Sequence, residues 1–419
     1  MNGAMNRAAL YLFVILSISC VLSCKDNNEV GAKQEVTAIN PMSGGYNTIV
    51  TIRGSNFLPS VSDNAVTFNG VAAVVRSVTA TSITVSVPVR AGSGVVVING
   101  VDTGMSFTYY PDIFVVGYEV TGTVTSAKMW KNGMTTVLSK AGEFATANGI
   151  AFDSDNIYIA GYALEGGYTV ARYWKNNVDT PLPGSELSST VNSVSVVGSD
   201  VYLVGSHAKT GAINIADYWK NETLVEVEDD GFPSFAKTHT IVGENVYLGG
   251  GQFVDGANVA TYWKNGKANR VSEIPSLING IFVQDDDVYL VGYEAPTPTT
   301  KFATYWKNGT AVRLTSGTYQ AEASAIKVVG NDIYITGYEH NAAHFFVAKF
   351  WKNGVETELA DGTNSSYTTS IDVLGGDVYI AGAEHNGINA SVAKYWKNGI
   401  SFPMTNGGRN AFAYDIILR

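Results

Sequence analysis

The chain has 419 residues, and its 37 Asp and Glu residues outnumber 27 Lys and Arg, which gives a formal net charge of −10. A chain this acidic argues against a nucleic-acid partner and against electrostatic docking on anionic lipid. The only cysteines are Cys20 and Cys24, so the chain after them has no disulfide and relies on core burial, which this length can supply.

The first 24 residues are typical of a targeting segment. Arg7 is the single charge before an apolar run at residues 8–18, which is too short to span a bilayer and fits the core of a signal peptide. The run ends in Val-Leu-Ser-Cys at residues 21–24, which resembles the lipobox of bacterial lipoproteins. That resemblance implies a signal peptide at residues 1–23, lipidation of Cys24 and contact with the membrane through the lipid anchor only. The alternatives are an ordinary secretory signal and an uncleaved anchor.

Residues 24–34 form a polar tether in this interpretation. Charged and amide residues occupy positions 25–29, directly after the cysteine. Such a stretch resembles the surface-export signal of Bacteroidetes lipoproteins. The resemblance implies a lipid-anchored protein of the outer membrane, exposed at the cell surface.

Residues 35–110 are predicted to form short strands separated by turns. The segment 65–68 precedes Asn69-Gly70, a strong hairpin signal, and the segment 95–98 precedes Asn99-Gly100. Residues 82–87 alternate with period two and stop at Pro88. Strands this short and regularly spaced predict an all-β sandwich.

The same segment resembles the IPT/TIG family of immunoglobulin-like domains. The matching pieces are Ile-Asn-Pro at 39–41, Ser-Gly-Gly at 43–45, and the segments 54–57, 66–70 and 83–88. The resemblance implies a structural and binding module without catalytic residues of its own, serving here as a spacer.

The remaining residues, 111–419, contain one phrase seven times. Trp-Lys-Asn, usually followed by Gly, recurs every 43–45 residues, and it contains every tryptophan of the chain: Trp130, Trp174, Trp219, Trp263, Trp306, Trp351 and Trp396. A period of this length with four strands and no helix is typical of a propeller blade. The tryptophans are expected to pack neighbouring blades together, and Asn-Gly to form the turn that follows. The alternative is seven equivalent ligand pockets around the rim.

The two ends of the repeat region predict how the ring closes. Residues 112–119 read as a second strand without a first strand before it, and residues 413–418 read as a first strand with nothing after it. Pairing of these two segments would complete one blade and remove the exposed sheet edges. The predicted fold is therefore all-β, an immunoglobulin-like sandwich followed by a seven-bladed propeller that its C-terminal strand closes.

One face of the propeller carries the candidate binding residues. The strand pattern puts His207, His340, His344 and His385 in loops between second and third strands, and several second strands end there in Tyr-Glu. The candidate ligand-binding set is Tyr118, Glu119, His207, Tyr293, Glu294, Tyr338, Glu339, His340, Glu384 and His385. Glu-His-Asn stands in two adjacent blades, at 339–341 and 384–386, and would suit sugar hydroxyls or a divalent cation. Zinc ligands must converge on one point, and two blades lie too far apart, so neither metal nor cofactor is predicted. The alternative is that these are solvated residues of two similar blades.

A second candidate is the axis of the ring. One residue of each first strand is expected to line a hydrated channel, and these residues are mostly small and polar: Asn148, Asn192, Lys237, Asn279, Ser324, Thr369 and Tyr414. Concave sites with a few convergent polar groups are default binding candidates.

Three functions follow from these patterns. No nucleophile elbow, zinc-protease motif, P-loop or dinucleotide fingerprint is present in the sequence. The first hypothesis is therefore a non-catalytic surface lipoprotein whose propeller face binds a glycan or another polar ligand. The second is a scaffold for a protein partner within an outer-membrane complex. The third is a propeller enzyme, a polysaccharide lyase or hydrolase, for which Glu339, Glu384 and Tyr414 are the least unsuitable candidates.

Overall fold

The computed structural model describes residues 33–153, 155–183, 188–209, 213–228 and 231–419. The predicted signal peptide, the lipidation site Cys24 and most of the tether lie outside these residues. Nearly every described element is a β-strand, apart from the short 3-10 helix η1 (Val61–Asp63), so the predicted all-β fold is confirmed. Within the described ranges no helix has the length and apolarity needed to cross a membrane.

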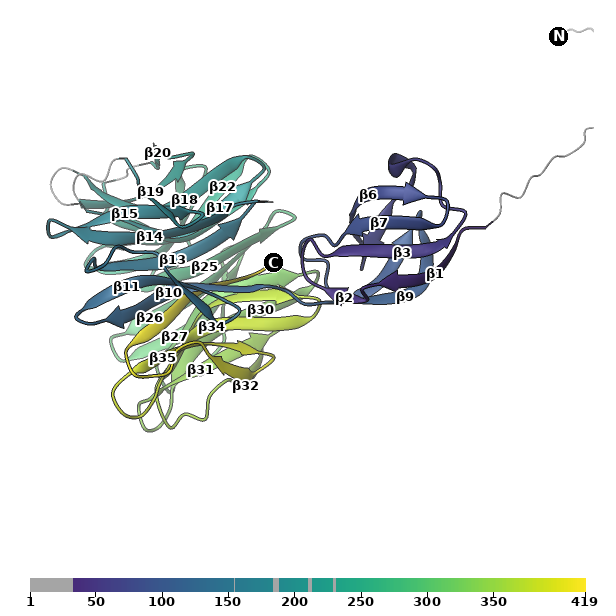
Figure 1. Cartoon of the computed structure of the whole chain (residues 1–419). Coiled ribbons are helices and arrows are strands. Elements are labelled where there is room, and N and C mark those ends of the chain that lie inside the picture. Colours follow the sequence, from purple (N-terminus) through teal and green to yellow (C-terminus); the bar gives the residue numbers. More distant parts are fainter. Residues whose placement is uncertain (1–32, 154, 184–187, 210–212, 229–230) are drawn as a thin grey trace, which may run out of the picture.

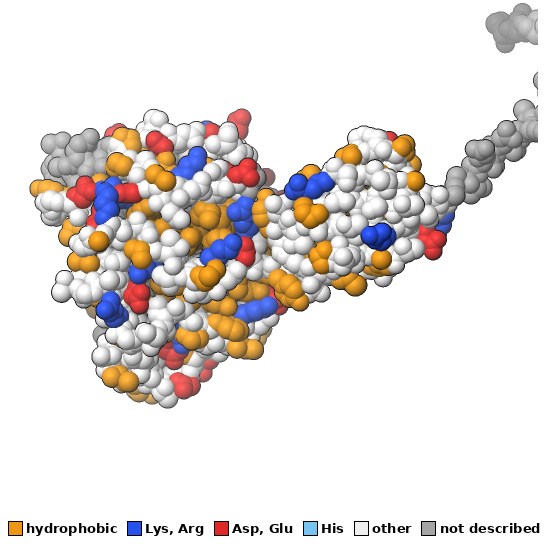
Figure 2. All heavy atoms as spheres, viewed as in Figure 1, with side chains coloured by type: hydrophobic (Ala, Val, Ile, Leu, Met, Phe, Trp, Pro, Cys, Tyr) orange, Lys and Arg blue, Asp and Glu red, His pale blue; other side chains and the backbone are white. Residues whose placement is uncertain are grey.

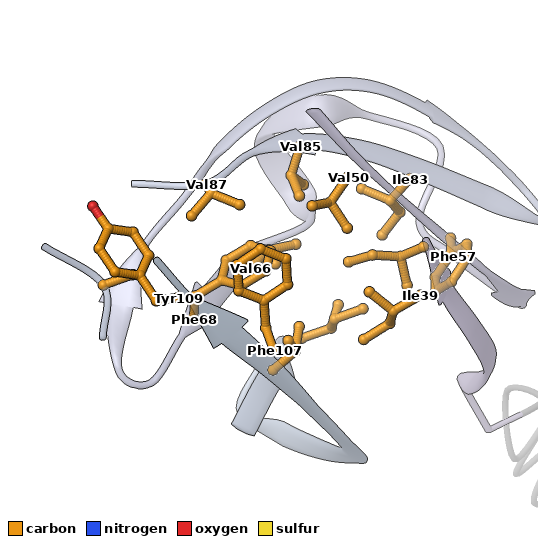
Figure 3. Packing of buried hydrophobic residues seen from close by; sticks show 14 residues of the cluster. Ile39, Val50, Phe57, Val66, Phe68, Ile83, Val85, Val87, Phe107 and Tyr109 are labelled. Atoms are coloured by element: carbon orange, nitrogen blue, oxygen red, sulfur yellow. The ribbon is translucent and has the colours of Figure 1, made fainter. Parts of the chain in front are cut away.

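The N-terminal body is a sandwich of two sheets, with strand orders β1-β3-β7-β6 and β2-β9-β8-β4-β5 (Figure 1). Its strands are β1 (Glu35–Asn40), β2 (Ser43–Gly44), β3 (Ile49–Ser55), β4 (Val66–Phe68), β5 (Val71–Ala72), β6 (Val74–Thr79), β7 (Ser82–Ser86), β8 (Gly94–Ile98) and β9 (Val101–Tyr109). Alternate residues of these strands point inward, since successive side chains of a strand face opposite sides. Figure 3 shows the resulting core, in which Phe68 and Phe107 pack edge to face at 5.0 Å.

The second body is a ring of seven four-stranded antiparallel sheets in the described part of the chain. The first strands are β13 (Ala145–Phe152), β17 (Ser189–Val197), β21 (Ser234–Val242), β25 (Ser276–Gln284), β29 (Ala321–Val329), β33 (Ser366–Leu374) and β37 (Ala411–Leu418). The second strands are β10 (Ile113–Thr121), β14 (Ile157–Glu165), β18 (Asp200–Lys209), β22 (Asn245–Val254), β26 (Asp287–Thr297), β30 (Asp332–His340) and β34 (Asp377–His385).

The third and fourth strands complete each blade. The third strands, each ending in the lysine of the repeated phrase, are β11 (Val124–Lys131), β15 (Tyr168–Lys175), β19 (Ile213–Lys220), β23 (Ala257–Lys264), β27 (Thr300–Lys307), β31 (Phe346–Lys352) and β35 (Ser391–Lys397). The fourth strands are β12 (Met134–Val137), β16 (Val178–Pro181), β20 (Thr223–Glu226), β24 (Lys267–Arg270), β28 (Thr310–Arg313), β32 (Val355–Glu358) and β36 (Ile400–Pro403).

The C-terminal strand closes the ring, as predicted. Strand β37 pairs antiparallel with β10, from Ile113 opposite Leu418 to Glu119 opposite Ala411, and so supplies the first strand of the blade that β10 begins. We number this blade 1 and the blades that begin with β13, β17, β21, β25, β29 and β33 as 2 to 7. The closure joins the two ends of a chain segment more than 300 residues long and leaves no first strand unpaired in the described part of the ring.

The tryptophan, lysine and asparagine of the repeated phrase make structural contacts in every blade. Each tryptophan is at most 1% exposed and packs on the preceding blade, as Trp351 does on Tyr289 and Ala303. Loss of such a buried ring costs about 3–5 kcal/mol. The lysine that follows places its Nζ 5.0–5.3 Å from the centroid of an aromatic ring on the second strand, in all seven blades. The asparagine adopts a φ of 49–53° and accepts a hydrogen bond from the backbone N–H at or near the start of the second strand, as Asn353 does from Ile333.

The sandwich packs against the face of the propeller where first strands turn into second strands. Arg90 donates to both carboxylate oxygens of Asp372, at 2.6 and 2.9 Å, and to the carbonyls of Leu418 and Val373, while Leu374 packs on the sandwich core. The two bodies meet at a narrow waist, with the C-terminus beside it (Figures 1 and 2). We call the propeller face that contacts the sandwich the lower face. The opposite, upper face carries the connections between second and third strands and lies away from the sandwich.

Candidate functional site

The axis of the propeller is lined by one unpaired residue from each first strand. The ladder between first and second strands slips by one residue in every blade, for example between Ala323 and Ala325, and leaves Ser324 without a cross-strand partner. Such a bulge turns the extra residue out of the regular alternation. The seven bulged residues are those predicted from the sequence, and all of them border one cavity: Asn148, Asn192, Lys237, Asn279, Ser324, Thr369 and Tyr414.

These axial residues also bind the next blade. Asn148 donates its side-chain amide to the carbonyl of Val191 at 2.9 Å, and Asn192 donates likewise to Ala236 at 2.8 Å. Asn279 and Thr369 make the equivalent bonds to Ala323 and Ala413. The acceptors precede the bulges of the following blades, so the polar axis satisfies backbone groups of the ring and keeps its remaining polar atoms for the cavity.

The axial cavity has a volume of about 560 Å³, which is in the range of small-molecule sites. Its upper part is bordered by Tyr162, Tyr338 and Tyr414 together with Glu322, and deeper walls include Ser370 and Asp415. Burial raises the pKa of Tyr414, and the nearby phenols of Tyr118 and Tyr162 raise it further. Ligands would therefore meet neutral phenol groups there.

A continuous band of aromatic rings follows the upper rim over blades 6, 7 and 1. We call it the aromatic arc, and its members are Tyr118, Tyr338, His340, Phe346, Tyr367, Phe412 and Tyr414. Adjacent ring centroids lie 4.0–6.3 Å apart, and each ring is only partly buried. Flat, partly accessible aromatic faces of this kind suit ligands that have an apolar face and polar edges.

Charged groups from blades 4, 5 and 6 continue the wall: Lys237 on β21, Lys301 on β27, and Glu322 on β29, where it lies opposite Tyr338 in the ladder. Lys237 donates to Asn279 Oδ1 at 2.7 Å, while Glu322 accepts from Lys301 at 2.6 Å and from Asn279 at 3.4 Å. Burial lowers the pKa of Lys237, an effect that Glu322 partly offsets. Lys301 also lies over the ring of Tyr293, with Nζ 4.2 Å from its centroid. Of the ten candidate residues, Tyr118, Tyr338 and His340 thus belong to the arc, and Tyr293 lies next to Lys301.

The candidate carboxylates do not face the cavity. Adjacent residues of a strand point to opposite sides, so Glu339 points away from the side that Tyr338 occupies. Glu339 pairs with Lys349 at 2.7 Å, Glu119 pairs with Lys128 at 3.5 Å, and Glu384 pairs with Lys394. The structure therefore corrects the expectation that tyrosine and glutamate form one binding surface: the glutamates hold second strands to third strands.

The remaining candidates also differ from the sequence interpretation. His207 lies inside β18, is 8% exposed, and its Nδ1 is 2.6 Å from Asp217 Oδ2, whereas a loop position was expected. His340 and His385 are the last residues of β30 and β34, whereas the sequence pattern put both in loops. Glu294 is buried and accepts from Ser272 Oγ at 3.1 Å.

The two Glu-His-Asn segments do not converge on one point. His340 packs on Phe346 at 4.0 Å between ring centroids, and His385 Nδ1 accepts from the backbone of Gly387 at 3.1 Å. Across the described residues, no three His, Cys, Asp or Glu side chains are placed together to hold a metal ion. The pair of segments offers two separate rim positions.

Three of the seven residues of the aromatic arc, Phe346, Tyr367 and Phe412, are not among the residues predicted from the sequence. Tyr367 and Phe412 precede the axial residues Thr369 and Tyr414 by two positions, and Glu322 precedes Ser324 in the same way. Because side chains alternate along a strand, a residue two positions before an axial residue shares its side and lies nearer the upper rim. That spacing was a usable signal. Phe346, at the start of β31, carries no comparable mark.

Several solved structures resemble the chain at low identity. A protein of unknown function from Bacteroides thetaiotaomicron covers 94% of this chain and 99% of its own length, at 12% identity and a TM-score of 0.49. An auxiliary nutrient binding protein from the same organism covers 91% and 85%, at 12% identity and a TM-score of 0.27. The β-propeller domain of the Trilobed protease from Pyrococcus furiosus covers 90% and 99%, at 10% identity and a TM-score of 0.42. Likenesses at these scores carry no inference about activity.

The sandwich has a clear family. No curated protein matches the chain. The family model of the IPT/TIG domain matches residues 35–112, which agrees with strands β1 to β9. Residues 35–112 are therefore an IPT/TIG domain, and a seven-bladed propeller follows it.

Proposed function

We propose that this protein is a non-catalytic binding protein whose propeller holds a glycan at the upper end of its axial cavity. The observation that carries the proposal is the aromatic arc on one side of a polar cavity of about 560 Å³. A sugar ring has an apolar C–H face that stacks on aromatic rings, and hydroxyl groups that bond to amides and phenols. Asn148, Asn192 and Ser324 supply such polar groups at the axis.

The position of the IPT/TIG domain supports display at a cell surface. The lipobox-like segment implies an anchor before this domain, and Arg90 joins the domain to the lower face of the propeller. An anchor on that side would direct the upper rim away from the membrane. We therefore propose a lipid-anchored protein of the outer membrane that presents the rim to the medium.

Catalysis is the less favoured reading of the same site. A glycosidase needs two carboxyl groups, or a lyase a base, within reach of one bond. Glu339 and Glu384 lie in ion pairs with lysines of the neighbouring strand in the same blade, and burial raises the pKa of Tyr414 away from the range of a useful base. The two glutamates therefore have a structural role in their blades.

The test is binding of the detergent-solubilised full chain to a broad glycan array. We expect a restricted set of glycans to bind, and Tyr118→Ala to weaken that binding by up to about tenfold, because a stacking contact with an aromatic ring is worth about 0.5–1.5 kcal/mol. Tyr168→Ala is the matched control, since Tyr168 is an exposed tyrosine outside the arc. A chain that binds no glycan, or a protein partner that stays bound in excess glycan, would overturn the proposal, the latter in favour of a scaffold.

A further inference from the structure

One axial position differs from the other six in charge. Asn, Asn, Asn, Ser, Thr and Tyr occupy this position in six blades, and all are neutral, whereas blade 4 carries Lys237. Its side chain is accessible from the cavity that it lines. An ammonium group inside a ring of seven blades is energetically unfavourable unless a partner compensates its charge, because partial loss of hydration disfavours the charged form.

The charge of Lys237 has no direct ion-pair partner among the described residues. Its Nζ donates to the neutral Oδ1 of Asn279 at 2.7 Å, which uses one of its three donors. The carboxylate of Glu322 is nearby but accepts from Lys301 at 2.6 Å. Two lysines therefore share the carboxylate of Glu322, which lies on blade 6 opposite Tyr338, and one positive charge is left over.

Asp415 is the other acidic residue that lines the cavity in the described part of the chain, and both of its carboxylate oxygens accept hydrogen bonds. One oxygen of Asp415 accepts from Ser370 Oγ at 2.5 Å and from its neighbouring backbone N–H, and the other accepts from the backbone N–H of Ile150 at 3.0 Å. Asp415 lies deeper than the tyrosines of the rim, on the wall of blades 1 and 7. It therefore does not neutralise Lys237 in blade 4.

The side chains around Lys237 leave room for a ligand. The second-strand position that holds Tyr338 in blade 6 and Tyr118 in blade 1 holds Ser206 in blade 3 and Gly251 in blade 4. The aromatic arc thus lies on blades 6, 7 and 1, whereas blades 3 and 4 combine the cation with serine and glycine at this second-strand position. A sugar ring that stacks on the aromatic side would direct its substituents toward the cation.

From this geometry we infer that the glycan bound in the axial cavity is acidic, and that Lys237 binds its carboxylate. The inference rests on the proposed glycan-binding function and names its ligand class, a uronic or sialic acid. The charge-assisted bond from Nζ would replace the missing ion pair of Lys237. The net negative charge of the protein acts against this ligand only at long range, because charges separated by more than about 8 Å are screened at physiological salt.

The experiment compares each acidic oligosaccharide with its methyl ester, which keeps the shape and removes the charge. Binding of both to the full chain in detergent is measured by calorimetry, using galacturonate, glucuronate and sialic-acid oligosaccharides. The variants are Lys237→Met and, as a control with the same change in net charge, Lys267→Met, at an exposed lysine outside the cavity. We expect the acid to bind about tenfold or more tightly than the ester, an advantage that Lys237→Met abolishes and Lys267→Met keeps.

The other outcomes separate the two proposals. If acid and ester bind equally and Lys237→Met affects neither, the acidic ligand is wrong while glycan binding stands. If Lys237→Met weakens acid and ester by the same factor, Lys237 acts through a hydrogen bond to an uncharged group, and the inference is again overturned. If no glycan, acidic or neutral, binds the wild-type chain, both proposals fail together. Lys237→Arg should restore preference for the acid, which a merely structural role would not require.

Discussion

Replacement of Arg90 by alanine should detach the IPT/TIG domain from the propeller without unfolding either. Arg90 makes four hydrogen bonds across the contact, two of them to the carboxylate of Asp372, which is 4% exposed. Removing one partner of a buried ion pair costs about 3–5 kcal/mol, since the other charge is left buried. The Arg90 side chain is 32% exposed, and Lys327 stays 3.4 Å from Asp372, so we expect about 2–3 kcal/mol. This corresponds to a roughly 30- to 150-fold shift of the docking equilibrium.

The loss should appear as motion between two folded bodies. Small-angle scattering of Arg90→Ala should show a larger maximum dimension than wild type, and amide exchange should rise at the end of β37, where Leu418 N donates to Asp372. Arg53→Ala, at an exposed position of β3, is the control and should change neither. Acidification should act in the same way, because Arg90 and Lys327 lower the pKa of Asp372 despite its burial. The contact then contributes stability above pH ~4 and loses it as the pH falls through the lowered pKa.

A double-mutant cycle decides whether the pair or the surrounding surface holds the domains. Asp372→Asn in the Arg90→Ala background should cost much less than it does alone, because the uncompensated charge is then gone. Equal scattering profiles and exchange rates for wild type and Arg90→Ala would refute the reasoning, and docking would then rest on apolar contacts such as Leu374.

Three further predictions concern the propeller. Burial lowers the pKa of His239 to about 4, so the free energy of unfolding should fall by up to about 3 kcal/mol as the pH falls from 6.5 to 4. Denaturation at several pH values should show this loss in the wild type and not in His239→Gln. Burial raises the pKa of Asp415 to about 6, so the free energy of unfolding should instead fall as the pH rises from 4 to 6, and Asp415→Asn should flatten that slope. For His239 and for Asp415 alike, a variant whose stability changes with pH as the wild type does would contradict the assignment. Trp219 Nε1 donates to Pro183 at 2.9 Å, whereas Trp306 Nε1, equally buried, has no partner among the described residues. In urea, Trp219→Phe should therefore cost about 1 kcal/mol more than Trp306→Phe, and equal costs would count against the bond.

The repeat made the propeller predictable from the sequence, because the same local rules recur in each blade. Asn-Gly after five of the seven third strands and a tryptophan at the same place in all seven indicate the same blade, and the ring closure follows from the incomplete ends. The axial residues were predicted because their position repeats, even though their bulges were not. Arg90 and Asp372, in contrast, are 282 positions apart, and no local pattern relates them.

The candidate site was only partly predictable, and the failure has a physical cause. Tyr338 and Glu339 are neighbours in sequence, yet the period of a strand sends them to opposite sides, so they cannot share one ligand. The partner of Glu339 is Lys349, which lies opposite Gly337 in the ladder between β30 and β31, and that register was not deduced from the sequence. The position of His207 was wrong for a related reason: β18 continues to Lys209, so His207 lies within the strand and not in a loop.

Comparison among the blades separates residues that hold the ring from residues that can bind. The tryptophan, lysine and asparagine of the phrase have equivalent contacts in all seven blades, so a substitution there should lower stability wherever it is made. The second-strand position of Tyr118 holds tyrosine in four blades and serine, glycine or alanine in the others, and its backbone bonds do not depend on that choice. Since the ring tolerates small residues at this position, Tyr118 is not required for closure of the propeller. Its substitution should therefore leave the unfolding curve close to wild type while it weakens binding at the rim, a combination that the buried phrase cannot produce.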